Sequence, residues 1–163
     1  MASPVWCIDT SSLIIVRSQF SRDERDAIFS ALSALVRGGR LRFPKQLVTE
    51  LERYLGRDNP ALEWVAAEQG TASSIAPSPE EVEAVLAQVP EVIDAEKEGV
   101  DEADPYVLAI ASRIIAGGGD ARVVTEEFKG TTEKMPLGSA AGYLRIPSMT
   151  LRTMLKFEGI LEY

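Results

Sequence analysis

The stretch that decides the fold is Val5-Trp6-Cys7-Ile8-Asp9-Thr10-Ser11-Ser12, an apolar run that ends in an acid and three hydroxyl residues. This pattern predicts a buried strand that leads into a helix beginning near Ser11. Residues 121–125 have the same apolar character and predict a second buried strand, and residues 143–146 predict a short third strand. Because helical patterns separate these strands, we expect the α/β class, with a short parallel sheet covered by helices on both faces.

Apolar residues recur at helical spacing between the expected strands. They predict helices over residues 23–36, 45–55, 61–69, 80–98, 104–115 and 148–157, loops over 70–79 and 130–139, and a short extended piece over 41–43. In the helix that starts with Asp104-Pro105, we expect Asp104 to be the cap and Pro105 the first helical residue. The loop over 70–79 does not separate two independent cores, so residues 1–163 are expected to form a single domain.

The composition excludes several kinds of site. The 163 residues include no histidine and a single cysteine, Cys7. The chain therefore has no Ser-His-Asp or Cys-His nucleophile system, no imidazole ligand and no cysteine-rich zinc site. The phosphate-binding patterns GxxxxGK[ST] and GxGxxG are also absent. A bound metal would have to be a hard ion held by oxygen atoms, which directs the search to carboxylates.

Charge is unevenly distributed along this chain, whose net charge is −8. Residues 17–57 hold nine basic and five acidic residues, whereas residues 63–104 hold one basic and twelve acidic residues. The basic stretch with Arg40, Arg42 and Lys45 has the spacing to contact a phosphate backbone, and the alternative is an ordinary solvated surface. No apolar run approaches the ~20 residues of a membrane span, and the start lacks the basic flank of a signal peptide, so we expect a cytoplasmic protein without a membrane partner.

Four acidic positions are predicted near the carboxyl edge of the sheet, where ligands bind in α/β folds. Asp9 follows the first strand, Glu126-Glu127 follow the strand over 121–125, Asp104 starts a helix, and Glu50 borders an apolar helix face. Each has an ordinary alternative, because Asp9 and Asp104 could cap helices and the glutamates could be surface acids. If the carboxylates converge, their repulsion calls for a divalent cation such as Mg²⁺ or Mn²⁺ or for raised pKa values.

Four segments together resemble a PIN domain, the small α/β fold of metal-dependent ribonucleases that includes many prokaryotic toxins. They are Ile8-Asp9-Thr10-Ser11-Ser12-Leu13-Ile14, Leu47-Val48-Thr49-Glu50-Leu51, Asp104-Pro105-Tyr106-Val107-Leu108-Ala109-Ile110-Ala111 and Val123-Val124-Thr125-Glu126-Glu127. Position by position, Asp9, Glu50 and Asp104 match the first three acids of the family. The fourth acidic slot falls on Glu127, with Glu126 as the alternative, and the family usually has the shorter Asp or Asn there.

The resemblance implies a three-layer α/β/α fold and a Mg²⁺- or Mn²⁺-dependent endoribonuclease. Asp9, Asp104 and Glu127, or Glu126 in its place, are then expected to hold one or two ions, and Glu50 to orient or deprotonate the attacking water. Contacts to RNA are assigned to Ser11, Thr125, Arg40, Arg42 and Lys45, and Asp101 is a possible additional acid.

The resemblance also implies a toxin with a cognate antitoxin, and a homodimer. The competing hypothesis is a catalytically silent PIN-like module that docks a protein partner through its acidic segment, residues 63–104.

Overall fold

The computed structural model describes residues 3–93, 102–129 and 134–161, and it has an α/β fold in three layers. The strands are β1 (Val5–Ile8), β2 (Leu41–Arg42), β3 (Ala121–Val124) and β4 (Ser148–Met149). The helices are α1 (Thr10–Gln19), α2 (Arg22–Arg37), α3 (Lys45–Tyr54), α4 (Pro60–Ala72), α5 (Pro79–Gln88), α6 (Asp104–Ala116), α7 (Leu137–Tyr143), α8 (Leu151–Phe157) and the 3₁₀ turn η1 (Pro90–Val92). The predicted fold class is confirmed.

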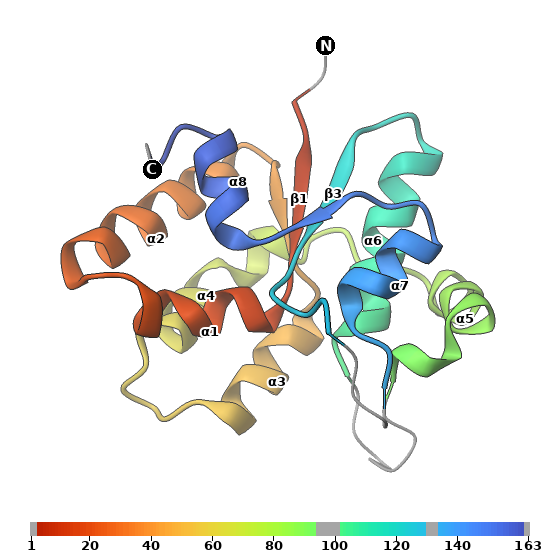
Figure 1. Ribbon diagram of the computed structural model, residues 1–163, viewed down its shortest axis with the longest axis horizontal. Coiled ribbons are helices and arrows are strands. Elements are labelled where there is room, and N and C mark those ends of the chain that lie inside the picture. Colours follow the sequence, from red (N-terminus) through yellow and green to blue (C-terminus); the bar gives the residue numbers. More distant parts are fainter. Residues whose placement is uncertain (1–2, 94–101, 130–133, 162–163) are drawn as a thin grey trace.

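The central sheet is entirely parallel in the described residues, with strand order β2-β1-β3-β4. Trp6 pairs with Leu41 on one side of β1, and Val5 to Ile8 pair with Ala121 to Val124 on the other. Since the strands are parallel, their carboxyl ends lie at one edge of the sheet, which is the lower end in Figure 1. The backbone of Asp9 extends this pairing, because its N–H donates to the Val124 carbonyl at 2.9 Å.

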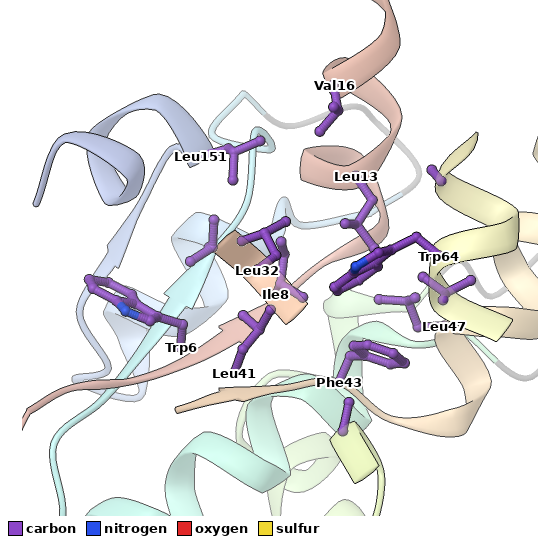
Figure 2. Packing of buried hydrophobic residues seen from close by; sticks show 14 of the residues in the cluster. Trp6, Ile8, Leu13, Val16, Leu32, Leu41, Phe43, Leu47, Trp64 and Leu151 are labelled. Carbon is purple, nitrogen blue, oxygen red and sulfur yellow. The ribbon is translucent and has the colours of Figure 1, made fainter. Parts of the chain in front are cut away.

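Alternate residues of β1 point into two separate hydrophobic cores. Trp6 and Ile8 are fully buried in a core formed with α1, α2, α3, α4 and α8, part of which is drawn in Figure 2. Cys7 faces the other core, built from α5, α6 and α7. Figure 1 shows these two groups of helices on opposite sides of the sheet. The period-2 alternation of a strand therefore explains why β1 is apolar at every position.

The predicted strand over residues 143–146 is wrong. α7 continues to Tyr143, and Arg145 has a left-handed backbone with φ of 60°, which no strand residue adopts. The Ile146 N–H donates to the Ala141 carbonyl at 2.8 Å and closes the helix end. The fourth strand is instead Ser148–Met149, so the last helix begins at Leu151, after Thr150, whose side chain caps it.

Three other boundaries differ from the prediction. α4 extends to Ala72, so the loop predicted from residue 70 begins at residue 73. α7 starts at Leu137, inside the loop predicted over 130–139. The helix predicted over 80–98 ends at Gln88, before Pro90 starts η1, and residues 94–98 as well as Asp101 lie outside the described residues.

Within the described ranges, none of the helices combines the length and the apolar character needed to cross a membrane.

Candidate metal centre

The acidic residues predicted at the carboxyl edge of the sheet come from four different elements. Asp9 directly follows β1, and Glu127 lies three residues beyond the end of β3. Asp104 is the first residue of α6, and Glu50 lies on α3. The parallel sheet brings these elements to one edge, so residues far apart in the sequence become neighbours.

Asp9, Asp104 and Glu127 form a compact group, which we call the acidic cluster. Each offers one carboxylate oxygen, and these three oxygens lie within 4.8 Å of one another. Asp9 is 1% and Asp104 2% exposed, and Glu127 is half-buried. Glu50 lies beside the cluster, because its Oε2 accepts a hydrogen bond from the Ala103 N–H at 3.0 Å, next to Asp104. The structure thus brings together the four acids predicted from the sequence.

Two hydroxyl groups hold the Asp9 carboxylate in place. Ser11 Oγ donates to Asp9 Oδ2 at 2.9 Å, and Thr125 Oγ1 donates to the same oxygen at 3.1 Å. The same hydroxyls accept backbone hydrogen bonds, Ser11 from Glu126 and Thr125 from Glu127. Ser11 and Thr125, predicted to contact substrate, therefore position Asp9 and the chain that carries Glu127.

Two oxygens of the acidic cluster are buried without a partner in the described residues, Asp9 Oδ1 and Glu127 Oε2. A buried acceptor without a donor costs free energy, on the order of 1–3 kcal/mol or more when it is charged. Both oxygens belong to residues that share the space of the cluster. Hard oxygen donors converging in this way fit the ligand preference of Mg²⁺ or Mn²⁺.

Burial and mutual repulsion raise the pKa values of the cluster. The pKa of Asp9 is raised from 3.8 to about 6, mainly by burial and also by the charges of Glu127 and Glu50, while the hydrogen bonds from the two hydroxyls offset part of this effect. Burial and the charge of Asp9 likewise raise the pKa of Asp104 well above its usual value. The pKa of Glu127 is raised by burial and by the charge of Asp104. The group is therefore costly to ionise without a cation.

Helix capping does not explain the two aspartates. The predicted cap role of Asp104 is wrong, since Ala103 precedes the helix in an already helical conformation and Asp104 is its first residue. No side-chain cap hydrogen bond is formed at the start of α6. Asp9 occupies the cap position of α1, but its side chain also makes no cap hydrogen bond. Both carboxylates point into the cluster instead.

Glu126, predicted as a metal ligand in place of or beside Glu127, does not belong to the cluster. Its Oε2 accepts hydrogen bonds from Ser12 Oγ at 2.6 Å and from the Leu151 N–H at 2.9 Å. These bonds connect α1 with the first turn of α8 and leave the fourth acidic slot to Glu127. The chain bends at Glu126 after the end of β3, and the Ser12 hydroxyl and the Leu151 N–H hold its carboxylate.

The predicted basic contacts are not gathered at the acidic cluster. Arg40 lies at the other edge of the sheet, where its carbonyl accepts from the Trp6 N–H and its guanidinium pairs with Glu158. Arg42 donates to Ser74 Oγ at 2.9 Å. Lys45 is exposed and begins α3, the helix that carries Glu50. Of these three residues, Lys45 is the one that shares an element with the site.

Sequence reasoning missed Lys134, the cation of this site. Its Nζ donates to Asp104 Oδ2 at 2.8 Å and lies 3.9 Å from Glu102 Oε1. Burial would lower the pKa of Lys134, but the charges of Asp104, Glu127 and Glu102 raise it above its usual value. The available signal was its place in the loop that follows Glu127, at the edge where the acids were expected.

Comparison with known proteins identifies one family. The profile of a family described as "Domain of unknown function (DUF4411)" matches residues 6–161, a range that includes the acidic cluster, Glu50, Glu126 and Lys134. No curated protein and no solved structure matches the chain.

Proposed function

We propose that this chain, which belongs to the DUF4411 family, is a Mg²⁺- or Mn²⁺-dependent endoribonuclease of the PIN type. The observation that carries the proposal is the pair of buried, unpartnered oxygens, Asp9 Oδ1 and Glu127 Oε2, in a cluster of three carboxylates. Such a cluster is costly for a metal-free protein and favourable around a divalent ion. The resemblance of the four acidic segments to PIN domains points in the same direction.

Asp9, Asp104 and Glu127 are the residues that would hold the ion. A divalent ion bound there would polarise a phosphate oxygen and lower the pKa of water. The chain contributes the placement of these ligands, since Ser11 and Thr125 hold one oxygen of Asp9 while the other is buried without a partner in the described residues. Hydrogen bonds from neighbouring groups to a ligating carboxylate keep it oriented toward the metal.

Glu50 is our candidate for orienting the attacking water and accepting its proton. It is the fourth carboxylate at the site, and in a chain without histidine general-base chemistry falls to a carboxylate. The water oxygen would form a bond to phosphorus while the bond from phosphorus to the 3′ oxygen breaks. The products would carry a 5′-phosphate and a 3′-hydroxyl, as the resemblance implies.

An exposed aromatic ring beside the cluster favours single-stranded RNA as the substrate. Phe128, the neighbour of Glu127, is 44% exposed, and its ring lies against Gly138. A Cβ atom at Gly138 would lie 2.5 Å from Phe128 Cδ1, so glycine is required for the ring to hold this place. Unpaired bases stack on aromatic faces with about 1–3 kcal/mol per base.

The test begins with calorimetric titration of Mn²⁺ into the wild type, Asp104→Asn and Glu126→Gln. We expect binding to the wild type and to Glu126→Gln, whose amide oxygen can still accept from Ser12 and Leu151, and loss of binding in Asp104→Asn. Cleavage of a labelled single-stranded RNA should then require Mn²⁺. The wild type and Glu126→Gln should cleave it, and Asp104→Asn should not. A folded wild type that binds no Mn²⁺ would refute the proposal.

A specific observation favours a second candidate, the silent PIN-like interaction module. Lys134 already neutralises part of the cluster charge, as expected of a site that is satisfied without a metal. This module would bind neither Mn²⁺ nor RNA.

For the enzyme, the resemblance suggests a toxin that is controlled by an antitoxin and forms a homodimer in the cytoplasm. These partners and this location are part of the same proposal.

A further inference from the structure

Backbone hydrogen bonds just after Lys134 attach its segment to neighbouring parts of the fold. The next residue, Met135, donates its N–H to the Glu91 carbonyl at 2.6 Å. Gly138, in the first turn of α7, donates its N–H to the Glu127 carbonyl at 2.8 Å. The backbone that follows Lys134 is thus attached both to η1 and to the chain segment of the cluster.

The Lys134 ammonium and a divalent ion would compete for the same carboxylate. Its Nζ is 2.8 Å from Asp104 Oδ2, and Asp104 is one of the three cluster residues. Two cations brought close together repel each other, so binding of an ion to Asp104 works against this ion pair. A lysine has a flexible stem and three donors, which allows its ammonium to leave one partner and still remain nearby.

We propose that Lys134 is a dual-purpose cation of the metal centre: it occupies Asp104 when no ion is bound, and it becomes a contact for the substrate phosphate once an ion takes Asp104. This inference rests on the metal centre of the proposed function. It adds a substrate-binding residue and a reason for modest metal affinity in the absence of substrate. The Lys134 side chain is 22% exposed, so a phosphate that approaches the cluster from solvent can reach it.

The first test is equilibrium binding of Mn²⁺, measured by calorimetry on the wild type, Lys134→Met and Lys134→Gln. Removal of the competing charge should tighten Mn²⁺ binding by about tenfold or more, which is about 1.4 kcal/mol. Lys134→Gln removes the charge but keeps a polar hydrogen-bond donor on a slightly shorter side chain, so it provides a second variant if Lys134→Met is unstable. Lys129→Met removes an exposed lysine five residues away and should leave the affinity unchanged. Equal or weaker Mn²⁺ binding by both Lys134 variants would overturn the inference.

The second test measures binding of a labelled single-stranded RNA at saturating Mn²⁺, in a Glu50→Gln background that impairs cleavage. Adding Lys134→Gln should weaken RNA binding about tenfold and reduce the slope of log affinity against log salt by about 0.7, the value for one phosphate contact on a single strand. An unchanged slope would overturn the phosphate-binding role.

The two proposals can fail separately. If wild type and Lys134→Gln bind Mn²⁺ equally well, the competition is absent while the metal centre stands. If none of the variants binds Mn²⁺, the metal centre itself is refuted, and this inference with it.

Discussion

Replacing Asp9 with asparagine should stabilise the metal-free protein. The Asp9 carboxylate is 1% exposed and surrounded by acids, and its pKa is raised from 3.8 to about 6. A raised pKa in the folded state means that ionisation opposes folding. Below pH 3.8 the carboxyl is protonated in both states, so there is no penalty. As the pH rises from 3.8 through about 6, the free energy of unfolding falls. At about 1.4 kcal/mol per pH unit, this loss amounts to about 3 kcal/mol above pH 6.

Asparagine fits this position because its amide oxygen and its NH₂ group match the surroundings of the two carboxylate oxygens of Asp9. The amide oxygen can accept from Ser11 and Thr125, as Asp9 Oδ2 does. The amide NH₂ can donate toward Asp104 and Glu127, where Asp9 Oδ1 has no partner in the described residues. The variant thus removes a charge and keeps the hydrogen bonds.

The assay is urea unfolding in EDTA at several pH values between 4 and 7.5. We expect the difference in stability between Asp9→Asn and the wild type to be smallest at pH 4, and the variant to be more stable by up to about 3 kcal/mol at pH 7.5. With Mn²⁺ at 100 times its dissociation constant, the wild type should gain about 2.7 kcal/mol and the variant nothing.

The matched control is Asp120→Asn, which removes a carboxylate paired with Arg122 at 3.0 Å at the opposite edge of the sheet. It should be neutral or slightly destabilising, and it should retain the stabilisation by Mn²⁺. If Asp9→Asn were less stable than the wild type at pH 7.5 in EDTA, Asp9 would be a structural acceptor, and the argument for a metal ligand would be lost.

Three further predictions concern residues near the cluster. Glu126→Ala should lower the free energy of unfolding by about 1–3 kcal/mol, because the Leu151 N–H loses its acceptor, and chemical denaturation measures this loss. If the folded variant lost Mn²⁺ binding, the purely structural role of Glu126 would be wrong. Phe128→Ala should raise the KM for single-stranded RNA about tenfold with little change in stability. Phe157→Ala, which removes another exposed ring at the end of α8, should leave KM unchanged, and equal effects of the two variants would refute the stacking role. Gly138→Ala should cost about 1–3 kcal/mol, since the added Cβ meets the Phe128 ring at 2.5 Å, and an unchanged melting temperature would show that the ring moves aside freely.

The sequence predicts the centre of the molecule better than its last third. β1 and β3 are apolar at nearly every position because both of their faces are covered, and this pattern is visible without a structure. The acids that follow these strands are predictable for the same reason. β4 has only two residues, Ser148 and Met149, and its pairing depends on β3, which local sequence does not reveal. Residues 143–146 are mostly apolar like a short strand, yet they close the end of α7, where Arg145 has a left-handed backbone.

Side-chain roles within the site were less accessible than the positions of its acids. Glu126 and Glu127 are chemically identical, and the choice between them is made by Ser12 and Leu151, which lie far away in the sequence. Lys134 contacts Asp104 across 30 residues, and nothing in its own segment identifies that partner. Long-range contacts of this kind are set by the fold and leave no local pattern.

The position of β1 between two cores has a consequence for folding kinetics. Glu50 belongs to a helix of the first core, whereas Asp104 and Glu127 belong to segments packed with the second. The Glu50 carboxylate approaches Asp104 and Glu127 only when both cores are assembled on the sheet, so its share of the repulsion develops late in folding. An ion that compensates it would act mainly after the transition state, at positions with low φ-values. Chelation of the proposed ion should therefore accelerate unfolding and leave the refolding rate nearly unchanged.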